Sequence, residues 1–177
     1  MRGSARWILG LLLAVALGVG IGAELAARRD RVRVHELVVL AVDAGRPTVG
    51  SALAAEDSYV LRVRLDRAGY AVVAHLRGPG LAELLFPSGG LIAFPGAVLV
   101  QIPEQETGIA WRLPATHEPQ AWLVAATRNP AVDLLDLEGR IRRAAQNSTS
   151  FEGDIAAVAR VLDKAIGPSR STILHPR

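Results

Sequence analysis

Histidine is the residue type in this chain best suited to acid–base or metal chemistry, and the spacing keeps the four copies apart. They form no HxH or HExxH arrangement. The four are His35, His75, His117 and His175. The one group of titratable residues that loops could bring together is Glu104 and Glu106 with His117 and Glu118. We expect these four to be solvated loop residues, because an acid–base or metal site needs convergent side chains with a defined geometry.

Signatures of other catalytic chemistry are missing from the sequence. The chain has no cysteine, which excludes thiol nucleophiles, zinc–thiolate sites and disulfides. It contains no Gly-x-Ser-x-Gly elbow and no Ser-x-x-Lys pair, and the turn Ser88-Gly89-Gly90 lacks the lysine of a phosphate loop. We therefore predict no catalytic, cofactor or metal site and a chain that is not an enzyme, with a hydrolase as a distant alternative.

Two tryptophans are the best candidates for a binding surface. Trp111 and Trp122 fall in two apolar segments that we expect to be neighbouring strands, where together they would cover a groove. We nevertheless expect at least one of them to be buried, because large aromatic side chains supply much of the apolar area in a core with few aromatics.

The N-terminal segment is predicted to anchor the chain in a membrane. Residues 1–6 form a basic tail, and residues 7–27 form an apolar run of about 20 residues, long enough for a transmembrane helix. Residues 28–34 form a basic linker whose arginines are expected to contact lipid head groups: Arg28, Arg29, Arg31 and Arg33. Because the densest positive charge lies here, we expect no nucleic-acid partner. A cleaved signal peptide is the alternative, although Leu25-Ala26-Ala27 fits a cleavage site poorly.

The orientation of the anchor is set by two opposing rules. The arginines after the apolar run outnumber those before it, which favours a cytoplasmic C-terminal domain. A short N-terminal tail, however, usually stays inside while the bulk of the chain is exported. We predict a single-pass protein of a bacterial inner membrane with the domain outside the cytoplasm, and keep the cytoplasmic orientation as an alternative.

We expect residues 35–177 to form a β-rich domain. Short apolar segments separated by turn residues predict strands at 35–42, 59–65, 70–76, 81–86, 91–94, 97–102, 108–113 and 120–126. Segments 59–65 and 70–76, joined by Asp66-Arg67-Ala68-Gly69, predict a β-hairpin, with Gly69 taking a positive φ in the turn. Residues 171–174 predict one more edge strand. This spacing favours an antiparallel β-sandwich.

Two C-terminal helices are predicted at about 130–145 and 150–166. Asn129 and Pro130 would begin the first helix, and Thr149 with Glu152 would form a capping box at the second. Charged pairs at i,i+4 spacing, Asp136 with Arg140 and Glu138 with Arg142, support the first helix. The apolar stripes of both helices are expected to pack on the sheet, and a helix pair that binds a partner is the alternative.

Residues 59–130 resemble a bacterial family called domain of unknown function 4384. The resemblance rests on the order of short features: the turn 66–70, Leu84-Leu85-Phe86-Pro87, Pro95-Gly96, Ile102-Pro103 and the segment 120–130. It implies an accessory module without catalytic residues of its own. We therefore expect a membrane-anchored accessory, sensor or protein-interaction domain of an envelope or signalling complex. A secreted or periplasmic ligand-binding module, released by signal cleavage, is the alternative.

Overall fold

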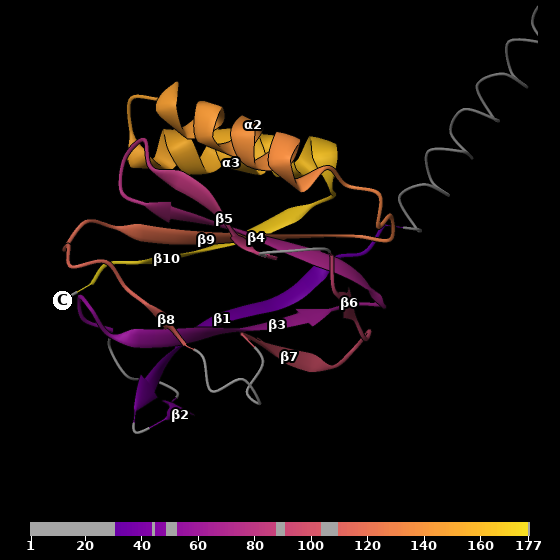
Figure 1. Ribbon diagram of the computed structural model, residues 1–177, viewed down its shortest axis with the longest axis horizontal. Coiled ribbons are helices and arrows are strands. Elements are labelled where there is room, and N and C mark those ends of the chain that lie inside the picture. Colours follow the sequence, from indigo (N-terminus) through magenta and orange to yellow (C-terminus); the bar gives the residue numbers. More distant parts are fainter. Residues whose placement is uncertain (1–30, 44, 49–52, 88–90, 104–109, 177) are drawn as a thin grey trace, which may run out of the picture. The chain divides into compact units, whose positions relative to one another are not determined.

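A computed structural model describes residues 31–43, 45–48, 53–87, 91–103 and 110–176; all of these except Arg31 belong to a compact unit that begins at Val32 (Figure 1). The predicted anchor, Arg28, Arg29, Glu104 and Glu106 lie outside these residues. Within the described part, no helix is long and apolar enough to cross a membrane. The fold is mainly β, with two antiparallel sheets and two C-terminal helices, as the turn-rich pattern predicts.

The first sheet has five antiparallel strands in the order β2-β1-β3-β7, with β8 paired to β3. Its strands are β1 Val34–Asp43, β2 Arg46–Thr48, β3 Ser58–Leu65, β7 Leu99–Ile102 and β8 Trp111–Arg112. Strands β7 and β8 are shorter than their predicted segments, and β2 was not predicted.

The second sheet also has five antiparallel strands, in the order β10-β9-β4-β5, with β6 paired to β4. Its strands are β4 Gly69–Arg77, β5 Ala82–Phe86, β6 Ala93–Phe94, β9 Gln120–Thr127 and β10 Ser169–Leu174. Strand β10 pairs with β9 along its whole length, which confirms the predicted C-terminal edge strand.

The two sheets share one apolar core. Alternate residues of β3, including Leu61 and Val63, meet Val73 of β4 and Val124 of β9, and all four are completely buried. Side chains on alternate strand positions point to the same face, so every second residue of β4 and β9 enters this core.

The opposite face of the second sheet is covered by the helical layer of α2 Leu134–Gln146 and α3 Phe151–Ala165 (Figure 1). Leu76 and Leu123 of the sheet pack with Leu137, Ile141 and Leu162 of the helices. Strands β4 and β9 are therefore buried on both faces, which explains why their sequences are almost continuously apolar.

The helices begin later than their sequence signals predict. At α2, the Asp133 carboxylate, not Asn129, accepts hydrogen bonds from the backbone amides of Leu135 and Asp136. At α3 the capping residue is Ser150, whose hydroxyl accepts from the Gly153 amide, so Thr149 and Glu152 form no capping box. Both pairs of charged residues predicted within α2 are present.

The predicted hairpin of 59–65 and 70–76 is wrong. Strand β3 pairs with β1, β7 and β8, whereas β4 pairs with β5, β6 and β9, so residues 66–68 cross from one sheet to the other. Gly69 does not take the positive φ expected of it. Glycine is needed there because a Cβ atom would lie 2.8 Å from the Thr127 carbonyl oxygen and 2.9 Å from Val32.

Candidate functional site

Trp122 belongs to the core between the sheets and not to an exposed surface. Its side chain is 0% exposed, its indole Nε1–H donates to the Tyr59 hydroxyl at 3.2 Å, and its ring stacks on His75. Trp111 lies on the other side of Tyr59, with ring centroids 5.8 Å apart, and is only partly buried. The structure thus brings the two tryptophans to one tyrosine, but Trp111 alone keeps a surface, because β9 is covered on both faces.

His75 joins this aromatic cluster to three polar side chains. Its Nε2 lies 3.0 Å from Gln120 Oε1, an oxygen that can only accept, so the imidazole donates there. The other nitrogen, Nδ1, faces Glu83 Oε1 at 3.6 Å, and Arg77 Nε lies 3.3 Å from the same oxygen. The neighbouring His75 ring and the positive charge of Arg77 hold the pKa of Glu83 below its ordinary value, against the opposing effect of burial.

Burial limits the access of a substrate to this cluster. His75 is 2% exposed, so a substrate has no direct access to its ring. Burial raises the pKa of Tyr59 far above its ordinary value, which keeps the hydroxyl neutral and unsuited to act as a nucleophile at neutral pH. Among the described residues, no group of three histidine or carboxylate side chains could hold a metal.

Burial of Tyr59 is expected to make the free energy of unfolding depend on pH in the alkaline range. Its folded-state pKa lies above the unfolded value of 10.0, so its contribution to stability is complete below about pH 10 and is lost as the pH rises further. We expect the free energy of unfolding to fall by up to about 1.4 kcal/mol per pH unit there, and Tyr59→Phe to remove that slope. Urea unfolding between about pH 9 and pH 11 measures it; equal slopes for both proteins would contradict the assignment.

The remaining histidines are solvent-exposed. His35, His117 and His175 are exposed, as is Glu118, in agreement with solvated loop positions for the predicted His117 and Glu118 cluster. Glu104 and Glu106 lie outside the described residues. His75 could not be singled out from the sequence, because its partner Gln120 is 45 positions away and belongs to no recognisable motif.

A groove between α2 and α3 is the candidate binding site. It is a shallow, open depression of about 620 Å³. Val161 and the loop residues 147–149 contribute to its lining, together with small residues: Ala144, Gly153, Ala156 and Ala157. The short side chains of Ala144, Ala156 and Ala157 leave room above the helices, whereas the space beside Gly153 is taken up by the Ser148 hydroxyl.

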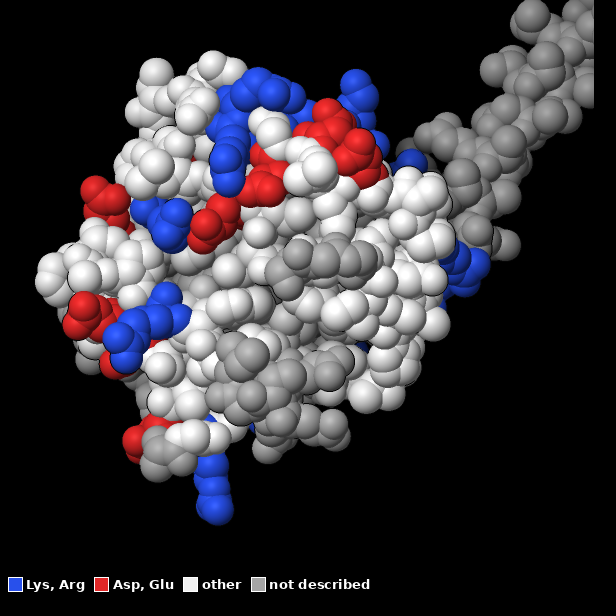
Figure 2. Space-filling model, in the orientation of Figure 1, with Lys and Arg blue, Asp and Glu red and all other residues white. Residues whose placement is uncertain are grey.

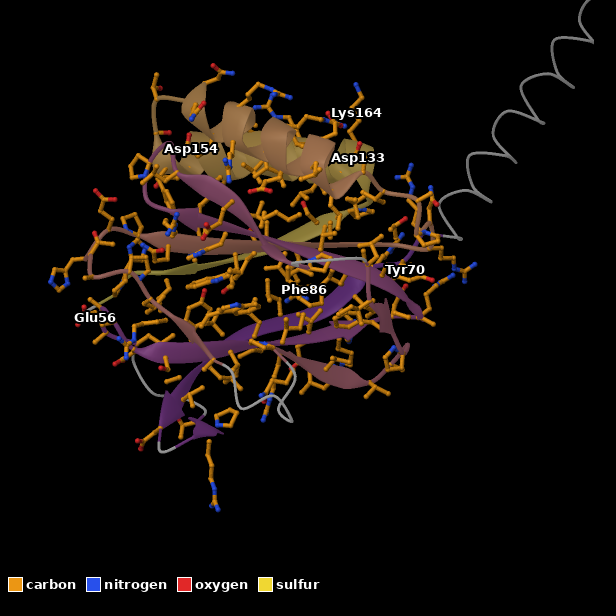
Figure 3. The ribbon with its side chains drawn as sticks, viewed as in Figure 1. Glu56, Tyr70, Phe86, Asp133, Asp154 and Lys164 are labelled. Atoms are coloured by element: carbon orange, nitrogen blue, oxygen red, sulfur yellow. The ribbon has the colours of Figure 1, made fainter. Side chains whose placement is uncertain are left out.

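Within the described part of the chain, no carboxylate lines the groove. Three basic side chains line it: Arg140, Arg160 and Lys164. Arg140 also lies 3.5 Å from Asp136, whereas Arg160 donates through Nε to the Ala156 carbonyl oxygen. Lys164 lies on the outer side of the helical layer (Figure 3). In the described region, neither Arg160 nor Lys164 forms an ion pair, so their charges are available to a ligand.

The groove was not identified from the sequence. Its basic residues come from two helices, and only the i,i+4 spacing of Arg160 and Lys164 places two of them on one helical face. No family model, no curated protein and no solved structure matches this chain. A function for this chain therefore has to be inferred from its sequence and its structure.

Proposed function

We propose that this chain is a non-enzymatic accessory domain, held at a bacterial membrane by residues 7–27, that binds a protein partner in the groove between α2 and α3. The groove is the observation that carries the proposal. It combines a lining that includes small residues with the uncompensated charges of Arg160 and Lys164. Such charges favour encounter with an oppositely charged partner and define its orientation.

A non-enzymatic role is supported by the state of the buried cluster. The two ring nitrogens of His75 face Gln120 and Glu83, and the ring is closed in against Trp122. A general base must reach a proton of the substrate, directly or through one water molecule. His75 instead serves the packing of the two sheets.

Membrane anchoring is supported by the sequence of residues 1–34. The apolar run and the arginines that follow it are the features of a single-pass anchor with a lipid-facing basic linker. We propose that the domain lies outside the cytoplasm, on the outer side of the inner membrane, where it would serve an envelope or signalling complex. The resemblance of residues 59–130 to domain of unknown function 4384 implies the same accessory role and stays a hypothesis. A mature N-terminus at Arg28 would instead identify a released module.

Native electrophoresis of mildly solubilised membranes tests the proposed function. The full-length chain is expected in the membrane fraction, in a complex larger than the chain alone. Ala157→Trp fills part of the groove and should release the chain from that complex. Leu135→Trp is the matched control, because Leu135 is 83% exposed on α2 and does not line the groove.

Thermal unfolding of both variants shows whether the domain still folds. Release by Ala157→Trp, with Leu135→Trp unchanged and both variants folded, would support partner binding in the groove. A wild-type chain that migrates alone, or an Ala157→Trp complex indistinguishable from wild type, would rule it out.

A further inference from the structure

The groove between α2 and α3 has two chemically different ends. Arg140, Arg160 and Lys164 lie toward one end, and the residues of the connecting loop, 147–149, lie at the other. From Gly153 to Lys164, α3 spans about 16 Å at about 1.5 Å per residue. The site is therefore elongated, with positive charge at one end and neutral hydroxyl and amide groups at the other.

We infer that the occupant is an acidic segment of a partner protein, lying along the groove with its carboxylates at the cationic end. This inference rests on the proposed function and names the chemistry of the partner. The alanine side chains of the lining let a second backbone approach closely, and the length of the groove accommodates about three helical turns. Arginine and lysine at the rim match carboxylates in charge and hydrogen-bonding capacity.

The charge around the groove favours a peptide over an anionic bilayer. Residues 133–165 carry six acidic and five basic residues, so the helical layer has almost no net charge to attract a membrane surface. Figure 2 shows basic and acidic side chains next to each other over this layer. Asp136, Glu152 and Asp163 are exposed and would be repelled by a flat anionic surface, whereas none of the three lines the groove, although Asp136 lies 3.5 Å from Arg140.

Binding of a designed probe tests the inference. The probe is a fluorescein-labelled helical peptide with one alanine face bordered by glutamates, and the matched peptide carries glutamine at those positions. Fluorescence anisotropy with the full chain in neutral detergent should show the glutamate peptide binding at least about tenfold more tightly. Added salt should weaken that binding, because the charges are exposed and screened over about 10 Å at 0.1 M ionic strength.

Charge-reversal variants localise the interaction. Arg160→Glu with Lys164→Glu should weaken binding of the glutamate peptide by at least about tenfold. Arg46→Glu with Arg112→Glu is the matched control, because both arginines are exposed on the first sheet and the change in net charge is the same. The control should bind within about twofold of wild type if net charge alone has little effect.

Three results would overturn the inference. One is equal binding of the glutamate and glutamine peptides, and another is an equal loss in both double variants. The third is binding of soluble short-chain phosphatidylglycerol or inorganic phosphate to the chain when neither peptide binds, which would identify a phosphate ligand. If Ala157→Trp still releases the membrane complex while the peptides fail to discriminate, the proposed function stands and only the acidic chemistry is wrong.

Discussion

Trp122→Ala is expected to lower the free energy of unfolding by about 3–5 kcal/mol. The indole is completely buried between the sheets, its ring lies 4.9 Å from the His75 ring at an interplanar angle of 8°, and it donates to the Tyr59 hydroxyl. Truncation leaves a cavity and removes that hydrogen bond. Since whole domains are stable by about 5–15 kcal/mol, this loss removes a large share of the total stability.

Trp111→Ala is the control for this prediction. Trp111 contacts the same tyrosine but keeps part of its surface in solvent, so less apolar area is lost. We expect a loss less than half as large in urea unfolding followed by far-ultraviolet circular dichroism. Equal losses for the two tryptophans would contradict the buried position of Trp122.

Leu162→Ala is expected to cost about 2–5 kcal/mol of stability. Leu162 lies on the inner face of α3, is 0% exposed, and packs in the core formed by the second sheet and both helices. Removing three carbon atoms there leaves a cavity that the sheet cannot fill, because the backbone of β4 and β9 is fixed by strand pairing on both sides.

Leu135→Ala supplies the matched comparison on α2. Leu135 is 83% exposed, so the same chemical change should alter the free energy of unfolding by no more than about 0.5 kcal/mol. An equally small loss of unfolding free energy for Leu162→Ala and Leu135→Ala would show that the helices do not form a common core with the second sheet. The positions of the two helices that form the groove would then be wrong.

The strands and helices could be largely predicted because local chemistry determines them. The alternation in 59–65 and the apolar run 120–126 gave β3 and β9 within one residue at each end. Pairing between strands could not be predicted in the same way. The connection of residues 66–68 would suit a hairpin, but β4 pairs instead with β5 and with β9, whose sequence lies about 50 residues further along the chain.

The ends of the helices show the same limit. Asn129, Asp133, Thr149 and Ser150 are all acceptable capping residues, and the sequence offers no local reason to choose between neighbours. Packing decides the choice. In α2, Leu137 and Ile141 must face the second sheet, and the helix that places them there begins after Asp133.

The candidate site was the least accessible part to sequence reasoning. Trp122 and Trp111 stood out by residue type, yet burial depends on which strands are covered on both faces, a property of the assembled layers. The groove depends on small residues from two helices, and in the sequence these alanines look like ordinary helix formers. The burial of Asp154, labelled in Figure 3, could not be predicted either. Its carboxylate accepts a hydrogen bond from the Gly80 amide at 2.7 Å, and Gly80 is 74 positions away in the sequence.

Site-specific photocrosslinking in intact cells tests partner binding in the groove most directly. A photoreactive amino acid replaces Ala157 in the full-length chain, with replacement of Arg46 on β2 as the control position. We predict a crosslink to a second polypeptide from position 157 that disappears when Arg160→Glu and Lys164→Glu are added, and no such product from position 46. The same product from both positions, or no crosslink at position 157, would contradict a partner-binding groove.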